Sequence, residues 1–155
     1  MQTLDQLIAE APVFAGLAEG YLKLIADCGV NAGFGAGELL VREGDPAELF
    51  FLLRRGSVAI ELDAPAGGPL LIETLQAGDV VGWAWLFEPY RWAFDARARE
   101  PVRAVAFDGA CLRGKCEADH ELGYELMRRF AASLTEDLQA TRLQLLDVYG
   151  RADVG

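Results

Sequence analysis

The amino-acid sequence predicts a mainly β fold with flanking helices: an antiparallel β-roll, similar to a double-stranded β-helix or jelly roll. The first observation is a series of short apolar runs, broken by Gly, Pro and Asp, from Gly33 to about residue 110. Such runs at even spacing are typical of a compact all-β unit. The other two observations are apolar residues at helical spacing before this part and a long helical pattern after it.

The length and composition are those of one folded domain, which we place at residues 1–155. Of the 155 residues, 52% are hydrophobic and 25% are charged, a balance that suits a single globular core. We expect a helical part at 1–32, the roll at 33–110 and a long helix at 118–149. No run of about 18 apolar residues occurs and no basic segment opens the chain, so neither a membrane span nor a secretory signal is expected. We therefore expect a cytoplasmic protein.

Two short helices are predicted before the roll. The first runs from Thr3 to Ala11, with Thr3 as its N-cap and Pro12 as its stop. Its apolar residues at helical spacing are Leu4, Leu7 and Ile8. The second ends near Gly29, and its apolar side is formed by Leu22, Ile25 and Ala26.

The strands of the roll are predicted from apolar runs that turn residues separate. They lie at about residues 39–41, 49–53, 58–62, 70–75, 80–82, 93–98 and 102–107. Leu49–Leu53 is apolar throughout, so we expect it to be buried on both faces. Val58, Ile60 and Leu62 alternate with Ala59 and Glu61, so one face of that strand should be buried and the other exposed.

Aromatic residues are concentrated between the last strands. The rings are Trp83, Trp85, Phe87, Tyr90, Trp92 and Phe94, and they include all three tryptophans of the chain. Such a cluster most often belongs to the core, and the alternatives are a surface that stacks on a ligand or contacts a partner.

The C-terminal segment reads as one helix of about eight turns. It is too long for a roll of this size to cover, so its distal half should need another surface. An apolar stripe recurs at three- and four-residue steps: Met127, Phe130, Leu134, Leu138, Thr141, Leu145 and Val148. This pattern predicts a homodimer joined along a short coiled-coil seam. The alternative is that the helix folds back over the roll and hides the stripe.

The cysteines predict no covalent framework. Cys28, Cys111 and Cys116 form an odd set without a CxxC pair, so we expect neither a disulfide nor a zinc cluster, but three reduced thiols.

Charge and composition argue against several function classes. The formal net charge of −10 repels phosphate backbones and anionic lipid, so neither nucleic acid nor a membrane is expected as a partner. Metal-dependent catalysis, as in cupin-type rolls, needs several His and Glu ligands, whereas His120 is the only histidine. No Gly-x-Ser-x-Gly motif occurs, and His120 is the only imidazole available as a base. We therefore expect no enzyme and an ordinary polar role for His120.

Glycine-marked segments follow one another in register along the roll. They are Gly37–Leu40, Glu43–Asp45, Leu49–Val58, Ala77–Gly82, Ala96–Ala98 and Pro101–Val105. In this order they resemble the cyclic nucleotide-binding domain of catabolite-activator-type regulators, of the regulatory subunits of cyclic-nucleotide-dependent kinases and of gated channels. The likeness covers essentially the whole chain.

The resemblance implies a phosphate-binding cassette at about residues 82–92. In the family a Gly-Glu pair opens a short helix and an arginine follows about ten residues later; amides and guanidinium hold the cyclic phosphate, and the glutamate accepts the ribose 2′-hydroxyl. Gly82 matches the glycine, but Trp83 stands in the place of the glutamate. Ala84 follows it, and Arg91 is the nearest arginine, although counting back from Ala98 puts Trp92 in the arginine's place.

The candidate ligand-binding residues are therefore Gly82, Trp83, Ala84, Arg91 and Trp92. An indole cannot accept the ribose hydrogen bond, and losing one charged hydrogen bond weakens binding by roughly ten- to a hundredfold. Three states of the pocket stay open: a cyclic nucleotide (cAMP or cGMP) bound in the family's manner, a different anionic or aromatic ligand, or an empty structural cassette.

These observations predict a non-enzymatic regulatory or sensor module that acts on an unidentified effector protein and has a degenerate cassette. The alternative is a dimeric protein-interaction scaffold that binds no nucleotide. The sequence ends six residues after Tyr149, where activator-type relatives carry a helix-turn-helix, so direct reading of DNA is not expected.

Overall fold

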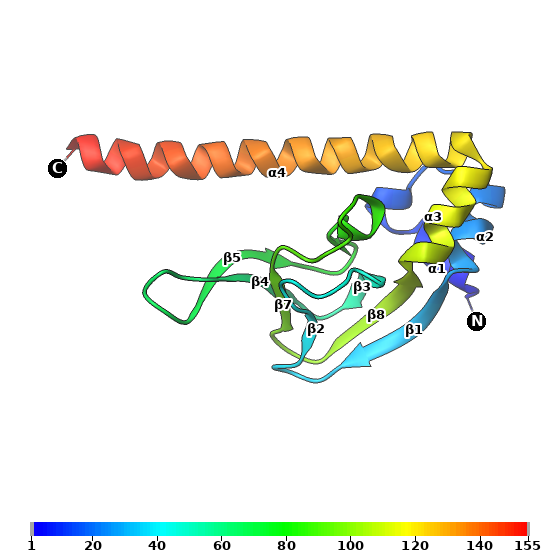
Figure 1. Cartoon of the computed structure of the whole chain (residues 1–155), viewed down its shortest axis with the longest axis horizontal. Coiled ribbons are helices and arrows are strands. Elements are labelled where there is room, and N and C mark those ends of the chain that lie inside the picture. Colours follow the sequence, from blue (N-terminus) through cyan, green and yellow to red (C-terminus); the bar gives the residue numbers. More distant parts are fainter. Residues whose placement is uncertain (1, 155) are drawn as a thin grey trace.

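A computed structural model describes residues 2–154 and shows a β-roll with helices at one end and a long helix across it (Figure 1). The helices are α1 (Leu4–Ala9), the 3-10 turn η1 (Pro12–Phe14), α2 (Glu19–Ala26), the 3-10 turn η2 (Ala84–Leu86), α3 (Gly109–Ala118) and α4 (His120–Val154). The strands are β1 (Gly29–Phe34), β2 (Leu39–Val41), β3 (Leu49–Arg55), β4 (Val58–Asp63), β5 (Pro69–Leu75), β6 (Val80–Val81), β7 (Asp95–Ala98) and β8 (Val102–Asp108). Among the described residues, no helix is both long and apolar enough for a membrane span.

Two antiparallel four-stranded sheets form the roll, so the predicted fold class is confirmed. One sheet has the strand order β1-β8-β3-β6 and the other β2-β7-β4-β5. β3 pairs with β8 so that Phe50 lies opposite Phe107, and β4 pairs with β5 so that Val58 lies opposite Leu75. Both sheets therefore mix strands from distant parts of the chain, as a roll requires.

An aromatic stack forms the centre of the core at the helical end of the roll. The ring of Phe50 stacks on Trp85 at 4.3 Å and on Phe107 at 4.9 Å between centroids. Phe14 adds an edge-on contact to Phe107 at 6.3 Å, which joins the N-terminal helices to the roll. Trp85 and Trp92 are buried, as a core role for the aromatic segment predicts, whereas Phe87 remains partly exposed.

The N-terminal helices are confirmed, with one difference in length. Thr3 caps α1 in a capping box with Gln6, and the helix ends at Ala9 rather than Ala11. In α2, Leu22 and Ile25 are buried as the apolar spacing predicts.

The start of the roll and the segment before α4 differ from the prediction. β1 begins at Gly29 and pairs along β8, four residues before the predicted start of the roll. Its six residues include two glycines and only two large apolar residues, Val30 and Phe34, which hides its strand character. α3 was not predicted, and α4 runs from His120 to Val154 rather than from 118 to 149.

The alternation predicted for residues 58–62 is wrong in part. Val58, Ala59 and Ile60 are all buried, whereas Leu62 is exposed. The physical reason is that β4 begins between other strands of the roll and then continues with β5 into a hairpin that projects from it (Figure 1).

The cysteine prediction is also wrong, because Cys28 and Cys111 form a disulfide. Their Cα atoms lie 5.8 Å apart across a sequence separation of 83 residues. Pairing of β1 with β8 places the end of α2 beside the start of α3, where the amide of Asp108 donates to the carbonyl of Cys28 at 2.8 Å. Cys116 is the free thiol.

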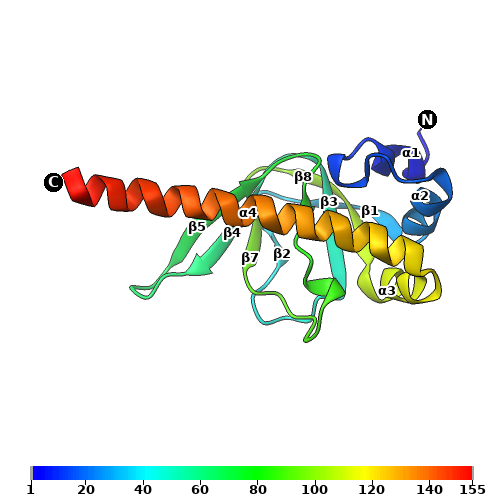
Figure 2. The same ribbon diagram turned by 90° about the horizontal axis from the view of Figure 1, so that it is seen from above.

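The first part of α4 packs on the body of the protein, and its distal part does not. Leu122 and Leu126 are fully buried, while Leu134, Leu138 and Leu145 are about half exposed. Figure 2 shows α4 crossing the roll and continuing past it. The helix thus lies over the roll without hiding the distal apolar stripe.

Gly56, in the tight turn between β3 and β4, allows a direct test of the roll's backbone. Its φ is +89° and an added Cβ would lie 2.5 Å from the carbonyl oxygen of Pro101. We expect Gly56→Ala to lower the free energy of unfolding by about 2–4 kcal/mol, measured by urea denaturation. Gly67→Ala is the control, because Gly67 has a φ of +93° but no atom within 4 Å; it should cost only about 1–2 kcal/mol. Equal losses in both variants would contradict the proposed clash.

Candidate functional site

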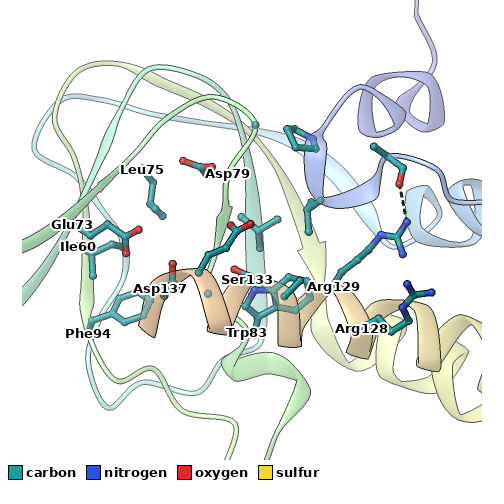
Figure 3. Close-up of a pocket in the computed structure, with 18 of the residues that line it drawn as sticks. Ile60, Glu73, Leu75, Asp79, Trp83, Phe94, Arg128, Arg129, Ser133 and Asp137 are labelled. Carbon is teal, nitrogen blue, oxygen red and sulfur yellow. Dashed lines mark hydrogen bonds between the residues drawn. The ribbon is translucent and has the colours of Figure 1, made fainter. Parts of the chain in front are cut away.

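A cavity of about 1080 Å³ lies between the roll and α4 (Figure 3). Its walls come from η1 and the following loop, from β4 and β5, from the segment around β6, and from α4. The apolar residues that line it include Ile60, Leu75, Val80, Trp83 and Phe94. The site is therefore built from parts of the chain that are far apart in sequence.

Of the five residues predicted to bind a ligand, Gly82 and Trp83 line this cavity. Gly82 has a φ of +67°, and an added Cβ would lie 2.6 Å from the Trp92 ring, so only glycine fits there. The turn at Gly82 places Trp83 before the three-residue turn η2. The Trp83 ring contacts Phe130 of α4 edge-on at 5.6 Å, so it bridges the cassette and the long helix.

The other three predicted residues lie outside the cavity lining. Ala84 is the first residue of η2, and Trp92 is buried beneath Gly82. Arg91 is exposed, and its guanidinium donates to the carbonyl of Gly44 at 2.9 Å. The structure therefore places the Arg91 side chain against the β2–β3 loop and not beside Gly82 and Trp83 in the cavity.

Two arginines that no sequence motif marks, Arg128 and Arg129, line the cavity from α4. Arg129 donates to Glu125 at 2.8 Å and to the carbonyl of Ala15 at 2.8 Å. Arg128 lies 3.8 Å from Glu125 and stacks over the Tyr124 ring. Their spacing from Glu125 was visible in the sequence, but their position at the cavity depends on how α4 crosses the roll.

Carboxylates line the other end of the cavity. Figure 3 shows Glu73, Asp79 and Asp137 at this end, from β5, the β5–β6 turn and α4. Partial burial, and then the negative charges of Asp137 and Asp79, raise the pKa of Glu73. Partial burial, Glu136 and Asp79 raise the pKa of Asp137 in the same way. This end of the cavity therefore repels a negatively charged group.

The described residues contain no group of three or more His, Cys, Asp or Glu placed to hold a metal ion. His120 is exposed at the first position of α4. The cavity thus offers apolar walls, aromatic rings, carboxylates and the two guanidinium groups of Arg128 and Arg129 for contact with a ligand.

Comparisons with known proteins match this architecture. A family model described as the cyclic nucleotide-binding domain matches residues 33–119. The chain is 26% identical over 131 residues to a CRP-like cAMP-activated global transcriptional regulator of Mycobacterium tuberculosis, covering 84% of this chain and 58% of that protein. It is 27% identical over 112 residues to a cAMP-dependent protein kinase regulatory subunit of Dictyostelium discoideum, covering 72% of this chain and 34% of that protein.

A solved structure gives the same result. The crystal structure of a protein from Geobacter metallireducens, assigned to the cyclic nucleotide-binding proteins, has a TM-score of 0.77 and 30% sequence identity. The match covers 89% of this chain and 99% of that one. The two curated relatives are longer than this chain. The match spans 58% of the length of the transcriptional regulator and 34% of the length of the kinase regulatory subunit.

Proposed function

The chain belongs to the cyclic nucleotide-binding domain family, and from this premise we propose that it is a non-enzymatic regulatory sensor module with a degenerate cassette. In this proposal the cavity under α4 does not hold cAMP or cGMP in the family's manner. The module instead responds to another ligand, and α4 transmits the response to an effector protein.

The observation that carries this proposal concerns the two positions expected to bind the nucleotide: the residue type at position 83 and the location of the Arg91 side chain. Trp83 stands where the family's glutamate is expected, and its indole ring forms part of the cavity wall. The guanidinium of Arg91 is bonded to the carbonyl of Gly44, away from the cavity. The cassette therefore presents neither the ribose acceptor nor the phosphate-binding cation to the cavity.

The charges around the cavity support the same proposal. Five of its lining residues are acidic: Glu73, Asp79, Glu125, Glu136 and Asp137. The two basic residues of the lining, Arg128 and Arg129, both lie beside Glu125, which offsets part of their charge. The lining thus carries more negative than positive charge, which disfavours a cyclic phosphate that must lose its solvation on entry. Among the ligand classes that the sequence left open, the walls favour an aromatic ligand without a negative charge.

Calorimetric titration with cAMP tests the proposal. We expect wild type to show no binding at micromolar nucleotide, because each missing charged hydrogen bond weakens binding by roughly ten- to a hundredfold. Trp83→Glu supplies a carboxylate and removes the indole, so its affinity should exceed that of wild type by about tenfold or more. Trp83→Ala is the matched control, since it removes the same ring and its contact with Phe130 without adding an acceptor. Micromolar binding of cAMP by wild type would overturn the proposal.

A second candidate function is a dimeric protein-interaction scaffold that binds no ligand. The observation in its favour is the exposed apolar stripe on distal α4, where Leu134, Leu138 and Leu145 contact nothing in the described chain that buries them. A thermal-shift screen of cyclic nucleotides and small aromatic compounds separates the two functions, because only a specific ligand stabilises the native state.

We propose the homodimer in both cases, with α4 as the interface. One residue of the predicted seam is not available to a second copy. The Phe130 ring packs against Phe87 at 4.6 Å and against Trp83 of the same chain. The seam available to a second copy begins at Leu134.

A further inference from the structure

The disulfide lies at the junction between the N-terminal helices and α3. Cys28 follows α2, and Cys111 is in the first turn of α3. One turn further along α3, Lys115 donates to the carbonyl of Leu24 at 2.9 Å and lies 3.5 Å from the carboxylate of Asp27. Residues four apart share one face of a helix. One face of α3 is therefore linked to the end of α2 by two interactions: the disulfide bond of Cys111, and the hydrogen bond and ion pair of Lys115.

This junction is continuous with the wall of the cavity. α3 ends beside α4, and the carboxylate of Asp119 accepts hydrogen bonds from the amides of Glu121 and Leu122 at the start of α4. Further along α4, Arg129 donates to the carbonyl of Ala15, and both residues line the cavity. Figure 2 shows α1, α2 and α3 grouped at the base of α4. A change at the α2–α3 junction would thus act on the helix that covers the cavity.

The two sulfurs differ in accessibility. Cys28 is 7% exposed, whereas Cys111 is only partly buried, so Cys111 is the more accessible residue of the pair. The third cysteine takes little part in exchange, because burial, Asp119 and Glu117 raise the pKa of Cys116 and keep it a neutral thiol. Exchange depends on the thiolate form. An external thiol is therefore expected to attack from the side of Cys111, and Cys116 offers little thiolate for exchange within the chain.

We propose that Cys28 and Cys111 form a reversible thiol–disulfide site that sets how firmly α3 and the base of α4 are held against the N-terminal helices. A small-molecule thiolate attacks the Cys111 sulfur, the bond to Cys28 breaks, and its electron pair leaves on Cys28, which takes up a proton. A second thiolate attacks the small-molecule sulfur of the mixed disulfide, which releases Cys111 and the oxidised small-molecule disulfide. In compartments that keep thiols reduced, protein disulfides usually serve such transient roles.

Hydrogen–deuterium exchange of the folded wild-type chain tests the proposal. The chain is equilibrated with reduced or oxidised glutathione, and its thiols are counted by alkylation and mass spectrometry. One alkylated cysteine is expected in the oxidised chain and three in the reduced chain, with full return on reoxidation. Amides of residues 109–132 should exchange about tenfold faster after reduction, while those of β3 should change little, because local opening exposes only the released segment.

Cys116→Ser is the matched control, and it should reproduce the wild-type difference between the two redox states. Cys111→Ser in oxidised glutathione should match reduced wild type. The proposal is overturned if no disulfide forms in the folded chain, if reduction requires unfolding, or if exchange in residues 109–132 is unchanged or rises equally with that of β3.

Discussion

Loss of the Cys28–Cys111 disulfide is expected to lower the free energy of unfolding by about 4.5 kcal/mol, because a cross-link over a long loop restricts the unfolded chain. The two cysteines are 83 residues apart, so the bond closes more than half of the chain into one loop. At roughly 2–4 °C per kcal/mol for a chain of this size, the melting temperature should fall by about 10–18 °C. Thermal unfolding with and without dithiothreitol, followed by circular dichroism at one protein concentration, measures the effect.

Two variants separate the bond from the thiols. Cys28→Ala with Cys111→Ala should melt like the reduced wild type and should not respond to dithiothreitol. Cys116→Ser keeps the bond and should show the full wild-type response. A shift below about 3 °C on reduction, which corresponds to roughly 1 kcal/mol, would show that the bond contributes little to stability.

The parts of the fold that the sequence predicted are those with a strong local signal. Leu49–Leu53 is apolar throughout, and Phe50–Leu53 form the buried centre of β3, whereas Leu49 at the start of the strand is 46% exposed and was wrongly expected to be buried. The helical spacing of α4 continues over many turns, so its type was clear even though its ends were not. Positions where only glycine fits, such as Gly56 and Gly82, marked turns whose backbone the structure confirms.

The features that the sequence missed depend on contacts between distant segments. β1 has no apolar alternation of its own, because it gains its partner from β8 at the other end of the roll. The disulfide follows from the same pairing, since it brings Cys28 beside Cys111, and an odd cysteine count gave no sign of it. Local pattern alone does not show which strand lies beside which.

Only part of the candidate site could be predicted, because the rest also depends on contacts between distant segments. Gly82 and Trp83 were found because a local motif marks the start of the cassette, and both line the cavity. The position of Arg91 depends on its hydrogen bond to Gly44, 47 residues away, which motif spacing does not report. The carboxylates and arginines that α4 adds to the cavity depend on its path across the roll.

That path also leaves a surface that a second copy would cover. Leu134, Leu138, Leu145 and Val148 are each between 47% and 62% exposed. They lie along the distal half of α4, which crosses the roll and continues past it (Figure 1). With Thr141 they repeat at three- and four-residue steps, the spacing at which one helix presents a continuous seam to another. A contiguous apolar stripe of this kind is uncommon on a monomer and typical of an interface.

Glutamates at Leu138 and Leu145 are expected to convert the dimer to a monomer. Four leucine side chains would leave the interface, at about 1.5 kcal/mol each, which raises the dissociation constant by roughly ten-thousandfold before charge repulsion is added. Light scattering behind a sizing column should give a mass near twice 16.8 kDa for wild type and the single-chain mass for Leu138→Glu with Leu145→Glu. Gln139→Glu with Ala140→Glu adds the same charge on the side of α4 opposite the seam and should leave the dimer intact. A monomeric wild type at about 50 µM, or a control pair that also dissociates, would contradict a seam at these leucines, because a stable dimer has a dissociation constant well below that concentration.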